Sequence, residues 1–417
     1  MAALRPTCTR WQRYVPKTCV TAANVRGWDG ALPLEARSGL KCSPASGHNG
    51  WVENFSSGEA GDQRFTIING YRTLKQAARS WEHFTSATPF RVPIPEESAV
   101  RPVRQYPIET DPPDHVAYRS IIASRFSRAA AEQHRSALTA VVDSLLEDAL
   151  AAGQLDVIEG FALPIVSHGI ALTMGRPEDT DRFLSWGLHV FVDPETGLRG
   201  RNADLDAYLA ERVDAALIEP ADDIFGDLAI ATFNNRTLTR DEMLGYGYLV
   251  LAGGRDTVIH SISGALRHLA TNPGAIASLR GDADAIQSAV EEFLRWVSPL
   301  PYIGRTVVSD TELDGCAFKA GELVALGFAA ANRDPSVFDN PDKCQLDRSP
   351  NRHVAFGHGP HTCIGAPLAR MELAVVLERF VSRIAECQVV QETVGDVAPT
   401  PNSGIATASL ADPLTLR

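Results

Sequence analysis

The chain has 417 residues, of which 44% are hydrophobic and 22% charged, a composition typical of a globular protein large enough to enclose a cofactor. Its formal net charge of −12 argues against a general nucleic-acid-binding role. The seven cysteines follow no spacing typical of a disulfide framework, which favours a reducing compartment. Because neither a secretory signal nor a long apolar run is present, we expect no membrane span and a cytoplasmic location.

The N-terminal stretch differs from the rest of the chain. Residues 1–28 carry basic side chains and no acid before Asp29, and they match no regular pattern. We interpret residues 1–60 as a basic, partly irregular arm. A strand is predicted over 64–70 and a helix over 71–81, followed by a proline-rich irregular connection over 87–110.

The next helix opens after Asp111-Pro112-Pro113 and contains two basic side chains, His115 and Arg119. Residues four apart on a helix project from the same face. Taken alone, this pair is more often a solvated basic edge than a binding site.

A long helix is predicted from Thr239 to Asn272, opened by a capping box of Thr239 and Glu242. It would contain about 32 residues and span about 48 Å. Gly253 and Gly254 interrupt it at a cost of about 1 kcal/mol each relative to alanine. The Thr257 hydroxyl can bond the Gly253 carbonyl and open the helix there. Close packing of another helix on the glycines is the alternative.

A further helix is predicted over 284–298, with Glu292 and Arg295 three residues apart on one face. This spacing alone describes a surface ion pair worth about 0.5 kcal/mol. Short strands are predicted around 305–308, 316–318 and 323–326, with a tight turn at Asp314-Gly315.

The stretch Phe356–Gly365 places one cysteine, Cys363, in a glycine-rich loop that leads into a helix. The N–H groups and the positive dipole end of a helix N-terminus favour an anionic sulfur. An isolated cysteine is more often a small buried hydrophobe. A zinc site is disfavoured, because no second Cys or His follows at the short spacings that structural zinc uses.

This stretch resembles the haem-binding loop of the cytochrome P450 family, Phe-Gly-x-Gly-x-His-x-Cys-x-Gly, with every fixed position filled. The resemblance implies a mainly α fold with small β-sheets and a long central helix over haem b. It also implies a single haem-thiolate monooxygenase domain, which we place over 61–417, because the motifs between 115 and 365 must meet at one site. Cys363 would then be the metal ligand.

The resemblance also assigns roles to the other motifs. Asp256 and Thr257 match the family's catalytic acid–alcohol pair, although Arg255 brings an unusually large charge to a variable position. His115, Arg119 and Arg305 match the residues that bind the haem propionates. Glu292 and Arg295 match a buried pair whose third partner is either Arg348 or His353. The remaining implied cofactor contacts are Phe356, Gly357, His361, Gly365, Ala252 and Gly253, and the implied substrate-pocket residues are Phe90, Val92, Ile94 and Ala252.

The implied activity is insertion of one oxygen atom of O2 into a small, mostly apolar organic substrate, by hydroxylation or oxidative dealkylation. No flavin or nicotinamide fingerprint is present, so electrons are expected from a separate ferredoxin and its reductase. The alternatives are a peroxide-driven peroxygenase and a non-catalytic haem-based sensor of gases or other ligands. We expect an acidic ferredoxin to dock on a basic face formed by Arg352, His353, His358, Arg370, Arg125 and Arg128.

Overall fold

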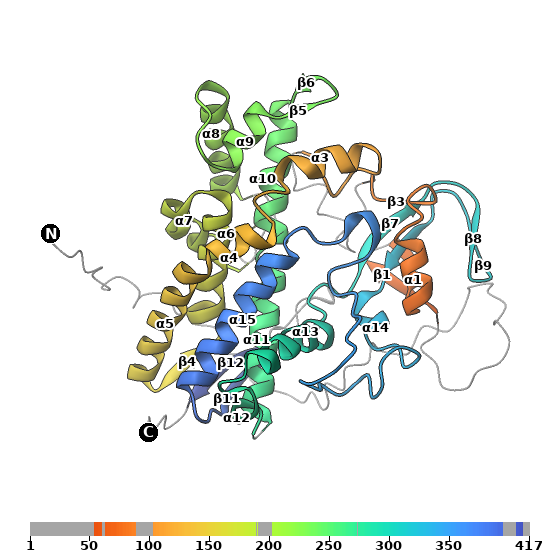
Figure 1. Cartoon of the computed structure of the whole chain (residues 1–417). Coiled ribbons are helices and arrows are strands. Elements are labelled where there is room, and N and C mark those ends of the chain that lie inside the picture. Colours follow the sequence, from red (N-terminus) through yellow and green to blue (C-terminus); the bar gives the residue numbers. More distant parts are fainter. Residues whose placement is uncertain are drawn as a thin grey trace. The chain divides into compact units, whose positions relative to one another are not determined.

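The computed structural model describes residues 54–60, 63–88, 103–188, 190, 202–272, 274–394 and 406–411 (Figure 1). The predicted fold class, mainly α with small sheets, is confirmed. The helices are α1 (Tyr71–Ala77), α3 (Asp114–Ile122), α4 (Arg128–Gln133), α5 (Arg135–Ala152), α6 (Leu163–Met174), α7 (Thr180–Ser185), α8 (Ala203–Ile218), α9 (Ile224–Ile230), α10 (Arg240–Gly253), α11 (Asp256–Thr271), α12 (Ala275–Leu279), α13 (Ala283–Val297), α14 (Phe328–Ala331) and α15 (Ala366–Arg383), with short helices η1 (Ile158–Ala162), η2 (Pro177–Asp179) and η3 (Gly359–His361).

The strands form small sheets. The five-stranded sheet has the order β1 (Phe55–Ala60), β2 (Gln63–Ile68), β10 (Leu323–Leu326), β7 (Ile303–Val307) and β3 (Phe84–Thr85). Strands β2 and β10 run parallel, with Ile67 opposite Ala325, so this sheet joins two distant parts of the chain. The other strands are β11 (Val389–Val394), β12 (Ala406–Ala411) and β4 (Gln154–Asp156) in one sheet, and the pairs β5 (Thr232–Phe233) with β6 (Arg236–Thr237) and β8 (Thr311–Leu313) with β9 (Cys316–Phe318).

The predicted turn between β8 and β9 is confirmed. Asp314 and Gly315 have positive φ values of 50° and 76°, as a two-residue hairpin turn matched to the strand twist requires. The sheet also begins earlier than the predicted domain boundary at residue 61. Backbone pairing of β1 with β2 brings Phe55–Ala60 into the sheet, so this part of the expected arm is regular strand.

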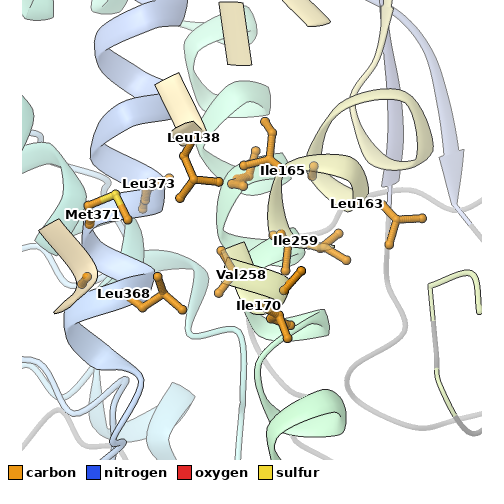
Figure 2. Packing of buried hydrophobic residues seen from close by; sticks show 14 of the residues in the cluster. Leu138, Leu163, Ile165, Ile170, Val258, Ile259, Leu368, Met371 and Leu373 are labelled. Carbon is orange, nitrogen blue, oxygen red and sulfur yellow. The ribbon is translucent and has the colours of Figure 1, made fainter. Parts of the chain in front are cut away.

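The main core lies among the helices. Helix α15 packs against α5, α11 and α13, and α6 packs against α5 and α11. Figure 2 shows Leu138 of α5, Ile165 of α6, Ile259 of α11 and Leu373 of α15 in one cluster of buried side chains. A second core lies between the five-stranded sheet, α1 and α14. The helix that follows Cys363 is therefore fixed in the interior of the helical part.

The predicted helix over 239–272 is divided in two. Its capping box is present, and the helix opens at the glycines, where the sequence predicts a local opening: α10 ends at Gly253 and α11 begins at Asp256. A Cβ on Gly254 would lie 2.9 Å from the Val250 carbonyl oxygen and 3.2 Å from Cδ1 of Ile170. The Val250 carbonyl in the last turn of α10 therefore favours glycine at the break, and the Ile170 side chain of α6 packs against it. Figure 1 shows α10 and α11 following one another through the helical part.

Two smaller expectations also change. Helix α1 ends at Ala77, four residues before the predicted end at Trp81, because a turn over 78–80 leads into β3. Among the described cysteines, Cys344 and Cys363 are free thiols, whereas Cys316 is disulfide-bonded. The disulfide at Cys316 does not agree with the reducing compartment that the cysteine spacing favoured.

Of the helices in the described part of the chain, none combines the length and the apolar character that crossing a bilayer requires.

Candidate active site

The loop before α15 holds Cys363 in a fixed backbone frame. Gly357 and Gly359 have φ values of 74° and 75°, a region that favours glycine. The Cys363 N–H donates to the Phe356 carbonyl at 2.8 Å, and the Thr362 hydroxyl donates to the Gly359 carbonyl at 2.8 Å. The loop thus places the cysteine just before the first turn of α15, as its sequence predicts.

The Cys363 side chain remains accessible to solvent, although burial raises the pKa of its thiol. The N–H groups of Gly365 and Ala366 and the charges of Arg119 and Arg370 act in the opposite direction. The predicted N–H donors at the helix start are therefore present, but burial has the larger effect on the pKa of the Cys363 thiol. Such a thiol is protonated when free and releases its proton to solvent when a metal ion binds the sulfur.

Basic side chains from three separate parts of the chain gather on the Cys363 side of the site. The charge of Arg119 acts on Cys363, and the charges of Arg119 and Arg305 act on both His115 and His361. The rings of His115 and His361 lie 4.1 Å apart between centroids. Burial, followed by repulsion from His361, Arg119 and Arg305, lowers the pKa of His115 to about 3. The Nδ1 atoms of both histidines are buried and have no hydrogen-bond partner in the described part of the chain. This cluster can accept an anionic ligand with several oxygens.

Asp111 joins this cluster, and the sequence did not single it out. Its Oδ1 lies 3.9 Å from Nε2 of His361 and accepts from the Ser86 N–H at 3.0 Å. The Ser86 hydroxyl lies 3.2 Å from the same Nε2. Burial acts to raise the pKa of Asp111, but the nearby His361 ring and the hydrogen bonds from Thr85 and Ser86 outweigh this effect and leave the pKa lowered. Asp111 therefore orients His361 as a carboxylate.

The break between α10 and α11 carries the other predicted site residues. The Thr257 hydroxyl donates to the Gly253 carbonyl at 3.4 Å, the contact predicted from their spacing. Gly253 is exposed, whereas Ala252, Asp256 and Thr257 are half-buried. A long hydrogen bond of this kind holds the hydroxyl weakly, so it remains available to another partner.

Known proteins identify this combination of features. A family model described as Cytochrome P450 matches residues 219–393. The cytochrome P450 monooxygenase PikC of Streptomyces venezuelae is 31% identical over 301 residues, which cover 71% of this chain and 72% of that protein. The chain belongs to the cytochrome P450 family of monooxygenases.

Other relatives agree. The steroid C26-monooxygenase of Mycobacterium tuberculosis is 31% identical over 331 residues, covering 77% of this chain and 87% of that protein. Among solved structures, a carbohydrate active P450 is similar with a TM-score of 0.78 and 32% identity, covering 86% of this chain and 94% of that one. The fold is therefore the P450 fold, and the family uses a haem-thiolate cofactor.

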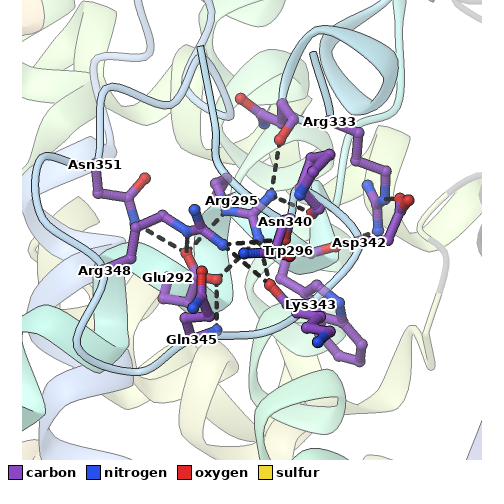
Figure 3. A network of polar contacts seen from close by, with 12 residues as sticks. Glu292, Arg295, Trp296, Arg333, Asn340, Asp342, Lys343, Gln345, Arg348 and Asn351 are labelled. Carbon is purple, nitrogen blue, oxygen red and sulfur yellow. Dashed lines mark hydrogen bonds and ion pairs between the residues drawn. The ribbon is translucent and has the colours of Figure 1, made fainter. Parts of the chain in front are cut away.

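A buried ion-pair network underlies the cysteine loop of this P450 (Figure 3). Glu292 and Arg295 are fully buried and joined by two hydrogen bonds of 2.8 Å. Arg348 completes the network through its Nε, 2.9 Å from Glu292 Oε2. His353 instead lies 3.0 Å from Glu291, which Arg370 also contacts. The structure thus decides the open choice in favour of Arg348.

A second network links α3 to α10 in this P450, and sequence reasoning missed it. The Tyr118 hydroxyl donates to Glu242 at 2.5 Å, and the Tyr246 hydroxyl donates to the Tyr118 carbonyl at 2.7 Å. Arg236 also donates to Glu242. The capping-box signal at Glu242 was visible in the sequence, but its tertiary partners were not. This network fixes the helix that carries His115 and Arg119 against α10.

Three predicted substrate-pocket residues, Phe90, Val92 and Ile94, fall outside the described residues.

Proposed function

We propose that this P450 binds haem b and inserts one oxygen atom of O2 into a small, mostly apolar organic substrate, by hydroxylation or oxidative dealkylation. The name of the relative from Mycobacterium tuberculosis, a steroid C26-monooxygenase, is consistent with such a substrate. We place the enzyme in the cytoplasm. Its activity belongs to the haem-thiolate domain that follows the basic N-terminal arm. The proposal rests on one observation: the same chain holds an accessible Cys363 in the glycine-rich loop and a Thr257–Gly253 hydrogen bond at the helix break.

The described residues fit haem. Cys363 is the metal ligand, and its neighbours Phe356, Gly357 and Gly365 shape the loop beside the cofactor. The basic cluster of His115, Arg119, Arg305 and His361 would hold the propionates, and the two buried Nδ1 atoms that lack partners among the described residues fit such an anionic group. Ala252 and Gly253 would be further cofactor contacts. When bound, thiolate-ligated haem activates dioxygen.

Asp256 and Thr257 handle protons in this proposal. Asp256 stands in the first turn of α11 and passes protons from solvent toward the break. Thr257 holds its hydroxyl proton at Oγ1, where the weak bond to the Gly253 carbonyl lets it turn toward the reacting oxygen. The role of Thr257 is to position a donor, because a hydroxyl is a weak acid.

Thr257→Ala is expected to keep haem and substrate binding but to divert electrons from product into hydrogen peroxide. The hydroxyl acts after substrate is bound, so its loss affects coupling. The ratio of product to NADH should fall about tenfold, since one hydrogen bond to a charged group is worth about 1.5 kcal/mol. Product, peroxide and NADH consumption are measured together, with ferredoxin and reductase added.

Thr257→Ser is the matched control, because it keeps a hydroxyl at the same position. Serine should restore most of the coupling. If alanine leaves product per NADH unchanged, Thr257 has no part in the reaction. The same assay separates the alternatives: a peroxygenase forms product from peroxide without the acid–alcohol pair, and a sensor consumes no NADH with any substrate.

The electron donor is the second part of the proposal, and the structure changes the face expected for it. Arg125 is committed to Asp227 and lies 3.4 Å from Asp222. Arg370 and His353 share Glu291, whose pKa remains low at about 2 despite burial because both of them hydrogen-bond to it. Much of the expected positive charge is therefore neutralised by internal acids.

Helix α1 offers unpaired cations instead. Its exposed side lines a shallow depression formed by Tyr71, Arg72, Lys75, Gln76, Arg79 and Ser80. Arg72, Lys75 and Arg79 have no ion-pair partner among the described residues. The end of α1 contacts the cysteine loop, because a Cβ on Gly359 would lie 2.6 Å from the Ala78 carbonyl oxygen. We therefore place the docking of an acidic ferredoxin on this α1 basic face, defined by Arg72, Lys75 and Arg79.

Reversing Lys75 and Arg79 to glutamate is expected to raise the apparent KM for an acidic ferredoxin about tenfold at low salt and to flatten its salt dependence. Long-range attraction speeds the encounter of oppositely charged proteins, and salt weakens it. Reduction of the ferric enzyme is followed by stopped flow over a range of ionic strength. Substrate affinity should not change.

Arg128→Glu serves as the control on the face expected from the sequence, because Arg128 is exposed. It should leave the kinetics nearly unchanged. A strong effect of Arg128→Glu together with none at Lys75 and Arg79 would place docking on the other face.

A further inference from the structure

Arg255 stands out among the buried charges of this P450. Its side chain is 0% exposed, as is that of Arg295. Arg295 uses all of its N–H donors, on Glu292 and on the carbonyls of Asn332, Pro341 and Lys343. Among the described residues, Arg255 makes one hydrogen bond, from Nη2 to the Gly187 carbonyl, and its buried Nε and Nη1 have no partner there.

Arg255 nevertheless remains a cation at neutral pH. Burial lowers the pKa of its guanidinium to about 10, and the neighbouring Asp256 acts to raise it. An incompletely paired buried cation costs free energy, and an apolar side chain of similar volume would usually be as stable or more stable there. The contribution of Arg255 to folding therefore does not explain its presence at the break.

The partner of Arg255 belongs to a rigid corner. Gly187 follows Trp186, which is 2% exposed and packs 5.1 Å from Phe183 between ring centroids. The Trp186 Nε1 donates to Asp204 at 2.7 Å, which ties the end of α7 to the start of α8. Arg255 therefore connects the break between α10 and α11 to a fixed point outside both helices.

We propose that Arg255 is a positioning residue that sets the geometry of the helix break, and through it the placement of Asp256 and Thr257, by anchoring the break to the Gly187 carbonyl. Arg255 is the last residue before α11, so its backbone determines where the first turn of that helix begins. Gly253 and Gly254 leave the chain flexible here, and the side-chain anchor removes that freedom. The proposal rests on the proposed function of Asp256 and Thr257.

The test compares Arg255→Met, Arg255→Lys, Thr257→Ala and Arg240→Met as haem-loaded enzymes. Methionine removes the donors at similar length, and Arg240 is a surface residue of α10 paired with Asp214. We measure the unfolding temperature, the CO-difference spectrum, substrate-induced spectral shifts and the product-to-NADH ratio. Arg255→Met is expected to keep the unfolding temperature, the CO-difference spectrum and the substrate-induced spectral shifts of the parent. It should lower the product-to-NADH ratio about tenfold, the effect of losing one charged hydrogen bond. Arg255→Lys should lie between methionine and the parent, and Arg240→Met should match the parent.

The outcomes separate the possible roles. A parent-like ratio in Arg255→Met overturns the proposal. A lowered ratio accompanied by an equal loss of unfolding temperature in both Arg255 variants also overturns it, because that describes a purely structural residue. If the methionine variant does not fold, Arg255→Lys decides: a ratio below the parent supports positioning, and a parent ratio excludes it. If Thr257→Ala is unaffected, the proposed function itself fails.

Discussion

Replacing Cys363 by serine is expected to abolish the CO-difference spectrum typical of thiolate-ligated haem. Cys363 alone stands in the glycine-rich loop before α15, remains accessible to solvent and receives the N–H groups of Gly365 and Ala366. Serine has no sulfur, and its hydroxyl does not ionise at neutral pH, so it cannot replace the anionic thiolate ligand. The spectrum of the reduced, CO-treated protein is the measurement, with haem content determined separately.

Cys344→Ala is the matched control for this experiment. Cys344 is also a free thiol, but burial, followed by the charge of Glu292, raises the pKa of its thiol to about 12. Unlike Cys363, Cys344 stands outside the glycine-rich loop, and no helix begins beside it. The control should retain the thiolate spectrum. Retention of that spectrum in Cys363→Ser would show that another residue holds the metal.

Glu292→Ala is expected to cause the largest loss of stability among the substitutions considered. The carboxylate lies fully buried against Arg295, and it also accepts from Arg348 at 2.9 Å and from the Gln345 N–H at 2.7 Å. Its removal leaves buried guanidinium charge without a carboxylate, which costs about 3–5 kcal/mol. Urea unfolding of the haem-loaded enzyme, followed by loss of the thiolate spectrum and by tryptophan fluorescence, measures the effect.

The control removes an exposed carboxylate from an ion pair of similar geometry. Asp214 lies 2.6 Å from Arg240, and both side chains are about half exposed. Such pairs contribute about 0–1 kcal/mol, so Asp214→Ala should barely move the unfolding midpoint. Glu292→Gln keeps the shape of the side chain and two polar atoms. Its unfolding midpoint should lie between those of Glu292→Ala and Asp214→Ala. Equal midpoints for Glu292→Ala and Asp214→Ala would show that the buried network does not hold the cysteine loop.

Features that depend on neighbouring residues could be predicted from the sequence. The cysteine loop, the capping box of Thr239 and Glu242, the Asp314-Gly315 turn and the Thr257–Gly253 contact each involve residues at most nine positions apart. Glycine conformations, capping hydrogen bonds and helix periodicity act over such distances. The family resemblance came from the same local motifs, and its fold and enzyme class are confirmed by the known proteins.

Only the tertiary structure decided which distant residues meet. Arg348 lies 56 positions from Glu292, His361 lies 275 positions from Ser86, and Arg255 lies 68 positions from Gly187. Spacing along the chain carries no information about such pairs. The form of the break in the central helix is of the same kind. Glycines permit a break there, but the packing of Ile170 against Gly254 and the hydrogen bond from Arg255 to the Gly187 carbonyl depend on the fold. Composition likewise showed which charges exist, but folding decided that Arg125 would pair with Asp227 and that Arg72, Lys75 and Arg79 would have no ion-pair partner among the described residues.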